Sequence, residues 1–83
     1  MSSTFKAMVR VFLKAGVLDV QGKAVEQALH GLGFPGVADV RVGRLIQFEV
    51  AAADADEART QVEAMCRRLL ANPVIESFEV EIA

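Results

Sequence analysis

Residues 45–82 read LIQFEVAAADADEARTQVEAMCRRLLANPVIESFEVEI and predict a strand, a helix and a second strand in succession. The first strand is expected over 45–52, because apolar side chains alternate there with polar ones, the two-residue period of a strand with one buried face. The last strand is expected over 75–82 for the same reason. The inward-facing positions of the two strands are Ile46, Phe48, Val50, Phe78, Val80 and Ile82.

The helix between these strands has clear start and stop signals. Asp54 is placed to accept the backbone amide of Glu57, a variant of the capping box. Asn72-Pro73 ends the helix, since proline disfavours the helical conformation at the residue before it. The predicted apolar stripe is Ala58, Val62, Met65 and Leu69, with Cys66 and Leu70 at its flank.

The first half of the chain repeats the pattern with one more strand. Residues 5–13 alternate as a strand, and a helix is expected from about 21 to 32, where Val25, Ala28, Leu29 and Leu32 form one stripe. Gly33 is expected to end this helix in the left-handed conformation. A further strand is predicted over 37–43, turning near Gly43 into the strand that opens at residue 45.

The resulting order βαββαβ predicts an α+β domain of ferredoxin-like topology. Right-handed crossovers would place both helices on one face of a four-stranded antiparallel sheet, with strand order 4-1-3-2. In that order the last strand lies beside the first, so that Glu79 and Glu81 pair with Lys6 and Arg10 on the open face.

Composition limits the function. Eighty-three residues and 8.9 kDa leave room for a single domain, residues 1–83. Nine basic against 11 acidic residues argue against a nucleic-acid partner. One cysteine permits no internal disulfide, and no apolar run reaches 18 residues, so no membrane partner is expected. A lone thiol without a signal peptide favours the cytoplasm.

The open sheet face is expected to carry apolar residues that are unfavourable in water. They are either scattered and tolerated or part of a docking face, and the mean hydropathy of +0.35 favours docking. The docking partner would be another protein or a second copy of the chain. The residues proposed for this homo-oligomer face are Met8, Phe12, Leu45 and Ile75.

Few residues have catalytic character. His30 stands near a helix end, where a satisfied or solvated histidine is more common than a general base, and Cys66 is interpreted as a packed thiol. The carboxylates at 54, 56 and 57 suit a helix start better than a metal site. Gly31, Gly33 and Gly36 have dinucleotide-loop spacing but follow a helix instead of opening one. No catalytic, cofactor-binding or metal-binding residue is therefore assigned.

Residues Met65–Glu76 read Met-Cys-Arg-Arg-Leu-Leu-Ala-Asn-Pro-Val-Ile-Glu, and further segments of note are Lys14–Ala24, Ala28-Leu29, Leu32-Gly33-Phe34 and Val40–Arg44. Together these segments resemble the PurS family of phosphoribosylformylglycinamidine (FGAM) synthase, and Met65–Glu76 is the most specific match. Val20 stands where this family usually has proline.

The resemblance implies a non-catalytic subunit of an ATP-dependent, glutamine-using ligase of de novo purine synthesis. A glutaminase subunit (PurQ) would release ammonia, and a synthetase subunit (PurL) would use ATP and magnesium to convert FGAR to FGAM. This chain would assemble the two and help ammonia pass between them, without a cofactor of its own. Members of this family have ferredoxin-like topology and form dimers or larger homo-oligomers, so a homodimer or homotetramer is expected.

The partner-contact candidates are family-like residues outside the expected core stripes. Asp19 and Arg41 are the stronger candidates because neither has an evident packing role, whereas Gly22 and Pro73 have turn-forming explanations. The complete set is Asp19, Gln21, Gly22, Arg41, Arg44, Asn72 and Pro73.

An alternative is an amino-acid-sensing domain of the ACT type, which shares the topology and acts as a dimer. Its glycine-bearing loop after the first strand loosely matches residues 19–22.

Overall fold

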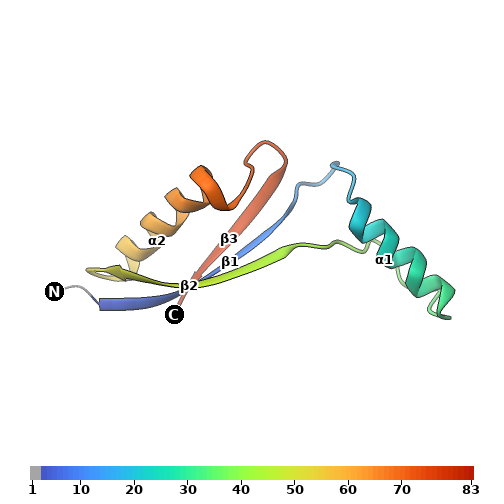
Figure 1. Ribbon diagram of the computed structural model, residues 1–83, viewed down its shortest axis with the longest axis horizontal. Helices are drawn as coiled ribbons and strands as arrows, with labels where there is room; N and C mark the ends of the chain where they lie inside the picture. Colours follow the sequence, from blue (N-terminus) through green and yellow to red (C-terminus); the bar gives the residue numbers. More distant parts are fainter. Residues whose placement is uncertain (1–2) are drawn as a thin grey trace.

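The computed structural model describes residues 3–83; residues 1 and 2 of the predicted domain lie outside the described part. No helix within the described range is long and apolar enough to span a membrane. In chain order (Figure 1) the elements are β1 (Ser3–Leu13), α1 (Val20–Gly31), β2 (Arg44–Ala52), α2 (Ala55–Met65), the π-helical turn η1 (Cys66–Leu70) and β3 (Glu76–Ile82).

The strands form one antiparallel sheet in the order β2-β1-β3. In the central strand, Val9 lies opposite Ile46 of β2 and Val80 of β3. Three strands therefore have the predicted neighbours, since this order is the 4-1-3 part of 4-1-3-2. The α+β class is confirmed, and the prediction of a four-stranded sheet is wrong for residues 3–83.

The missing strand is the one predicted over 37–43, which forms no ladder. Asp39 has φ of 54°, and this left-handed conformation interrupts an extended strand. The amide of Val42 donates to the Asp19 carboxylate at 2.8 Å instead of to a neighbouring strand. The alternation of valines in this segment therefore reflects a connection that packs locally.

Helix α2 covers one face of the sheet and closes the core. Its start is confirmed, because the Glu57 amide donates to Asp54 Oδ1 at 2.8 Å. The Glu57 carboxylate reaches back to the amide of Ala53, one residue earlier than in a standard capping box. The buried core comprises Ala7, Val9, Val11, Val50, Ala52, Ala58, Val62, Cys66 and Ala71.

The predicted stripe of α2 is wrong at Leu69, whose exposed fraction is 83%. The reason is η1, where the Ala71 amide donates to the Cys66 carbonyl at 3.0 Å, five residues back. The wider turn shifts the helical phase, so that Cys66 enters the core and Leu69 faces outward. Asn72-Pro73 follows this turn and ends the helical segment as predicted.

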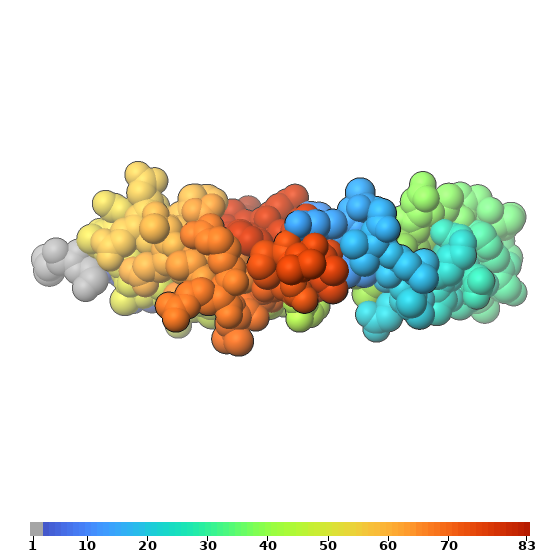
Figure 2. Space-filling model, turned by 90° about the horizontal axis from the view of Figure 1, so that it is seen from above, coloured from blue at the N-terminus to red at the C-terminus, as the bar shows by residue number. Residues whose placement is uncertain are grey.

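Residues 14–43, here called the arm, carry α1 away from the sheet (Figures 1 and 2). The helix itself is confirmed within one residue of its predicted ends, and Gly33 caps it with φ of 96°. Within residues 3–83, α1 has no substantial contact with any strand or with α2. The prediction that both helices cover one sheet face is therefore wrong.

The arm makes the molecule elongated, with extents of 55 × 25 × 14 Å. The radius of gyration is 16.4 Å, whereas a compact chain of this length would have about 12 Å. The accessible surface is 5828 Å², against roughly 4,800 Å² expected for a folded monomer of this mass. A chain of this shape leaves about 1,000 Å² of additional surface available to another protein.

Candidate partner interface

The predicted contact residues gather where the arm joins the sheet. Asp19, Gln21 and Arg44 line one open depression of ≈ 250 Å³, together with Phe12 and Glu76. Gly22 and Arg41 lie beside it, where the arm joins the sheet. Asn72 and Pro73 belong to the turn before β3. The structure thus brings together residues that are as much as 64 positions apart, such as Phe12 and Glu76.

Asp19 has a packing role, contrary to the prediction. Its side chain is buried, and its two oxygens accept the amides of Gly22 and Val42, each at 2.8 Å. These two amides hold the pKa of the Asp19 carboxyl below its usual value, and the nearby Arg41 charge acts in the same direction. Both carboxylate oxygens are therefore engaged within the chain itself.

Gly22 and Arg41 complete a local structure around Asp19. A side chain at position 22 would collide with the Val40 carbonyl oxygen, which shows that the returning chain passes directly against the first turn of α1. Arg41 Nη2 donates to the carbonyls of Leu13 and Lys14 at 3.0 and 3.2 Å, while much of the side chain stays exposed. We call Asp19, Gly22, Val40, Arg41 and Val42 the arm root.

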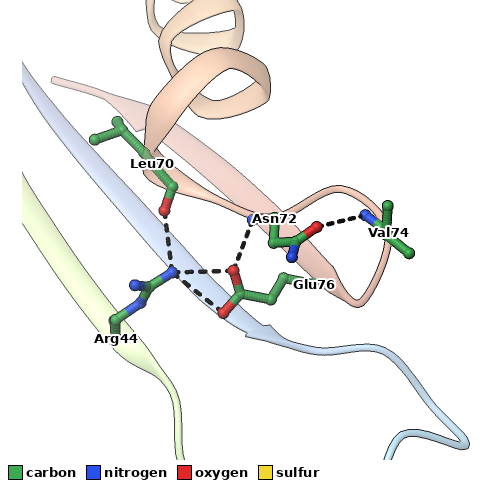
Figure 3. A network of polar contacts seen from close by, with 5 residues as sticks. All are labelled: Arg44, Leu70, Asn72, Val74 and Glu76. Carbon is green, nitrogen blue, oxygen red and sulfur yellow. Dashed lines mark hydrogen bonds and ion pairs between the residues drawn. The ribbon is translucent and has the colours of Figure 1, made fainter.

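Arg44 and Asn72 belong to a polar network that joins β2, η1 and β3 (Figure 3). Arg44 Nη2 donates to the Leu70 carbonyl and to both Glu76 oxygens at 3.1 to 3.2 Å. The Asn72 amide donates to Glu76 Oε1 at 2.7 Å, and the Asn72 side chain accepts the Val74 amide. These hydrogen bonds hold the turn at residues 72–75 in place, so its residues have a structural role.

Pro73 is tied to the same region, because Lys14 Nζ donates to its carbonyl at 2.7 Å. Partner contact by the predicted set stays a prediction. Its exposed members are Gln21, Arg41, Arg44, Asn72 and Pro73, whereas Asp19 and Gly22 are buried.

The predicted homo-oligomer face is mixed in character. Phe12, Leu45 and Ile75 are exposed and Met8 is half-buried. Charged residues separate these apolar groups. Arg10 lies opposite Glu79 but forms its ion pair with Glu81 at 3.3 Å, so cross-strand pairing of charge is confirmed for Arg10. Docking through this face stays a prediction.

Sequence reasoning missed a second apolar surface, on the arm. The stripe of α1 was recognised, but it was assigned to the core of the chain itself. The two long connections that flank this helix were the available signal, because they allow it to leave the sheet. The exposed apolar residues of the arm are Leu18, Val20, Val25, Leu32 and Phe34.

The residues with catalytic character have structural partners. His30 Nε2 donates to the Val37 carbonyl at 2.7 Å, which confirms a satisfied histidine. Cys66 is fully buried, and burial raises the pKa of its thiol, so it is a packed thiol as predicted. In the described part of the chain, no three His, Cys, Asp or Glu residues are grouped as metal ligands.

Comparison with known proteins gives one consistent family. The family model described as "PurS: Phosphoribosylformylglycinamidine (FGAM) synthase" matches residues 6–83. The chain is 42% identical over 78 residues to "Phosphoribosylformylglycinamidine synthase subunit PurS" of Bacillus subtilis, covering 94% of this chain and 92% of that protein.

Solved structures agree with this match. The crystal structure of PurS from Methanocaldococcus jannaschii, described as one of the subunits of formylglycinamide ribonucleotide amidotransferase in the purine biosynthetic pathway, superposes with a TM-score of 0.85. It is 37% identical and covers 95% of each chain. A chain in the structure of PurLQS from Thermotoga maritima has a TM-score of 0.89 at 32% identity, covering 98% of this chain and 99% of that one.

Proposed function

The chain belongs to the PurS family of FGAM synthase, and on that premise we propose that it is the assembly subunit of this ligase. The enzyme converts FGAR to FGAM with glutamine and ATP in de novo purine biosynthesis. A cytoplasmic location is part of the proposal, since the relatives are subunits of a biosynthetic enzyme.

The observation that carries the assembly role is the uncovered arm. Helix α1 has an apolar stripe but no sheet of its own to cover. The exposed side chains of the arm include Val25 in α1 and Leu32 and Phe34 just after it. A stable interface buries about 800 Å² per partner, which is close to the additional surface of this chain. We infer that a second copy covers the arm and that the subunit acts as a homodimer or a larger homo-oligomer.

The catalytic partners are assigned by family membership. A relative of this chain occurs in the PurLQS structure, which supports assembly with a PurL-like synthetase and a PurQ-like glutaminase. In this proposal ATP, magnesium and glutamine are used by those two subunits, and this chain carries no cofactor. The exposed residues around the arm root, including Gln21 and Arg41, are its candidate contacts.

The mechanism is one of effective concentration. Ammonia released at one active site escapes to solvent unless the second active site is held nearby. A rigid adaptor that binds both subunits makes the second encounter intramolecular, which raises the local concentration without any new covalent chemistry. The relatives and structures above give no support to the ACT-type alternative.

The test is FGAM formation by the two catalytic subunits, with and without this chain. Glutamine-dependent turnover should require the chain, whereas turnover with added ammonia should not, because free ammonia does not need a second active site nearby. Full glutamine-dependent turnover without the chain would contradict the proposal. Calorimetry against free amino acids would then test the sensing alternative.

A further inference from the structure

The direction of the arm is decided at its root. α1 has no substantial contact with the strands or with α2, so its orientation depends on the two segments that connect it to the sheet. These are the outgoing segment 14–19 and the returning segment 37–43 (Figure 1). Whatever holds these two segments together determines where α1 points.

Two side chains join the segments in the described part of the chain. Arg41 of the returning segment donates to the carbonyls of Leu13 and Lys14 at 3.0 and 3.2 Å. Asp19 of the outgoing segment accepts the Val42 amide at 2.8 Å. The Arg41 bonds are exposed, whereas Asp19 is buried and its bond to Val42 is partly buried, so the Asp19 bond is the less open to competition with water.

Asp19 differs from the other capping aspartate in one respect. Asp19 and Asp54 each cap a helix by accepting an amide three residues ahead at 2.8 Å. Only Asp19 uses its second oxygen on a different segment. A cap alone would require one oxygen, and Asn or Ser would serve at such a position. The second bond therefore has a purpose other than helix initiation.

We propose that Asp19 is a positioning residue for assembly. By joining the start of α1 to the returning segment, Asp19 holds the arm in the direction in which the arm meets the second copy of the chain. This inference rests on the proposed assembly function. An arm that is already ordered loses less conformational freedom on binding, so affinity rises without a new contact. Gly22 is part of the same device, since only glycine lets the Val40 carbonyl pass this close.

The decisive variant is Asp19→Asn. Asparagine caps helices as well as aspartate, but one of its two terminal groups is an NH2 donor. In the place of Asp19 it can accept only one of the Gly22 and Val42 amides and turns a donor toward the other. The matched control is Asp54→Asn, which makes the same chemical change at a cap without a second bond. Asp19→Ala removes both bonds and should give the larger effect.

The first readout is glutamine-dependent turnover of the complete complex as a function of subunit concentration. For Asp19→Asn the half-saturating concentration should rise about tenfold, while the plateau at saturation stays within about twofold. The Asp54→Asn protein should match the wild type in both values. Ammonia-dependent turnover should not change with any variant.

The second readout is the arm itself in the full chain. Spin labels on cysteines introduced at the exposed positions 24 and 47, diluted with unlabelled protein, report the distance from α1 to the sheet; the native Cys66 is buried and does not compete. The wild type should give a narrow distance distribution and Asp19→Asn a broad one.

Each outcome decides something. Wild-type values for Asp19→Asn in both readouts would overturn the positioning role, as would an equal rise in half-saturation for Asp54→Asn. If the wild-type chain supports no glutamine-dependent turnover, the assembly function itself fails. The distance distributions then still decide whether Asp19 orders the arm.

Discussion

The two helices of this chain are similar in length and start signal but opposite in environment. α1 and α2 have 12 and 11 residues, and each begins at an aspartate that accepts an amide three residues ahead. α2 buries Ala58 and Val62 against the sheet, whereas the only buried residue of α1 is Gly22. An amphipathic stripe therefore shows that a helix will be covered, but not whether its own chain or another molecule covers it.

The strongest test of this difference places the same charge in both helices. Val62→Asp should prevent folding, because an unpaired carboxylate in the core costs several kcal/mol and a domain has only about 5–15 kcal/mol of stability. Val25→Asp should leave a folded chain, since position 25 is 42% exposed. Thermal unfolding followed by circular dichroism distinguishes the two.

The control for this pair is Thr60→Asp at an exposed position of α2, which should remain folded. Loss of folding in Val25→Asp would mean that α1 contributes to the stability of the isolated subunit, and the contrast between the helices would fail.

The next test compares two exposed leucines of similar exposure. Leu32 at the end of α1 and Leu69 in η1 have exposed fractions of 73% and 83%. If a second copy covers the arm, Leu32→Asp should weaken self-association by about 2 kcal/mol or more, as loss of a central apolar contact does. Sedimentation velocity over a concentration series measures the change. An equal effect of Leu69→Asp would place the interface elsewhere.

Local sequence signals predicted most of the sheet and of α2 correctly. The strands at 5–13 and 45–52, the Asp54 cap and the stop at Asn72-Pro73 depend on contacts close in sequence or on a simple period. Leu69 was misplaced because η1 changes the helical phase, and neither period nor propensity contains that change.

The arm shows the limit of the same reasoning. Asp19 was a candidate because it had no evident packing role, but its carboxylate accepts the amide of Gly22 and that of Val42, 23 residues away. The strand predicted over 37–43 did not form for a related reason, since its Val42 amide donates to Asp19 and not to a neighbouring strand. Contacts of backbone groups across a long connection leave no residue pattern to recognise.

The third prediction concerns the packed thiol of Cys66 in the core between the sheet and the helical segment. Cys66→Ser should lower the free energy of unfolding by about 1–3 kcal/mol, because it replaces a fully buried sulfur by a hydroxyl, which is more costly to remove from water. Chemical denaturation measures this loss. Cys66→Ala, which removes volume but adds no polar group, is the matched control.

The same residue predicts the direction of a pH effect. Burial raises the pKa of the Cys66 thiol, so the folded chain keeps its proton while the unfolded chain loses it. This contribution to stability is complete below the pKa of the unfolded thiol and is lost as pH rises above it. Cys66→Ala should lack this alkaline decline, and an identical decline in both proteins would assign it to other groups.

The smallest expected effect concerns two ion pairs of the sheet. Arg44–Glu76 and Arg10–Glu81 have N–O distances of 3.1 and 3.3 Å, but the Glu76 side chain is 19% exposed and the Glu81 side chain 54%. Glu76 also accepts the Asn72 amide, so it has less freedom to leave the pair. Double-mutant cycles should give a coupling of about 1 kcal/mol for Arg44–Glu76 and at most about 0.5 kcal/mol for Arg10–Glu81.

The coupling of the Arg10–Glu81 pair should also fall in 1 M salt, where screening acts within about 3 Å. Equal couplings would mean that the network at the arm end of the sheet is no firmer than the open face, and that the arm root has no rigid base from which to direct α1.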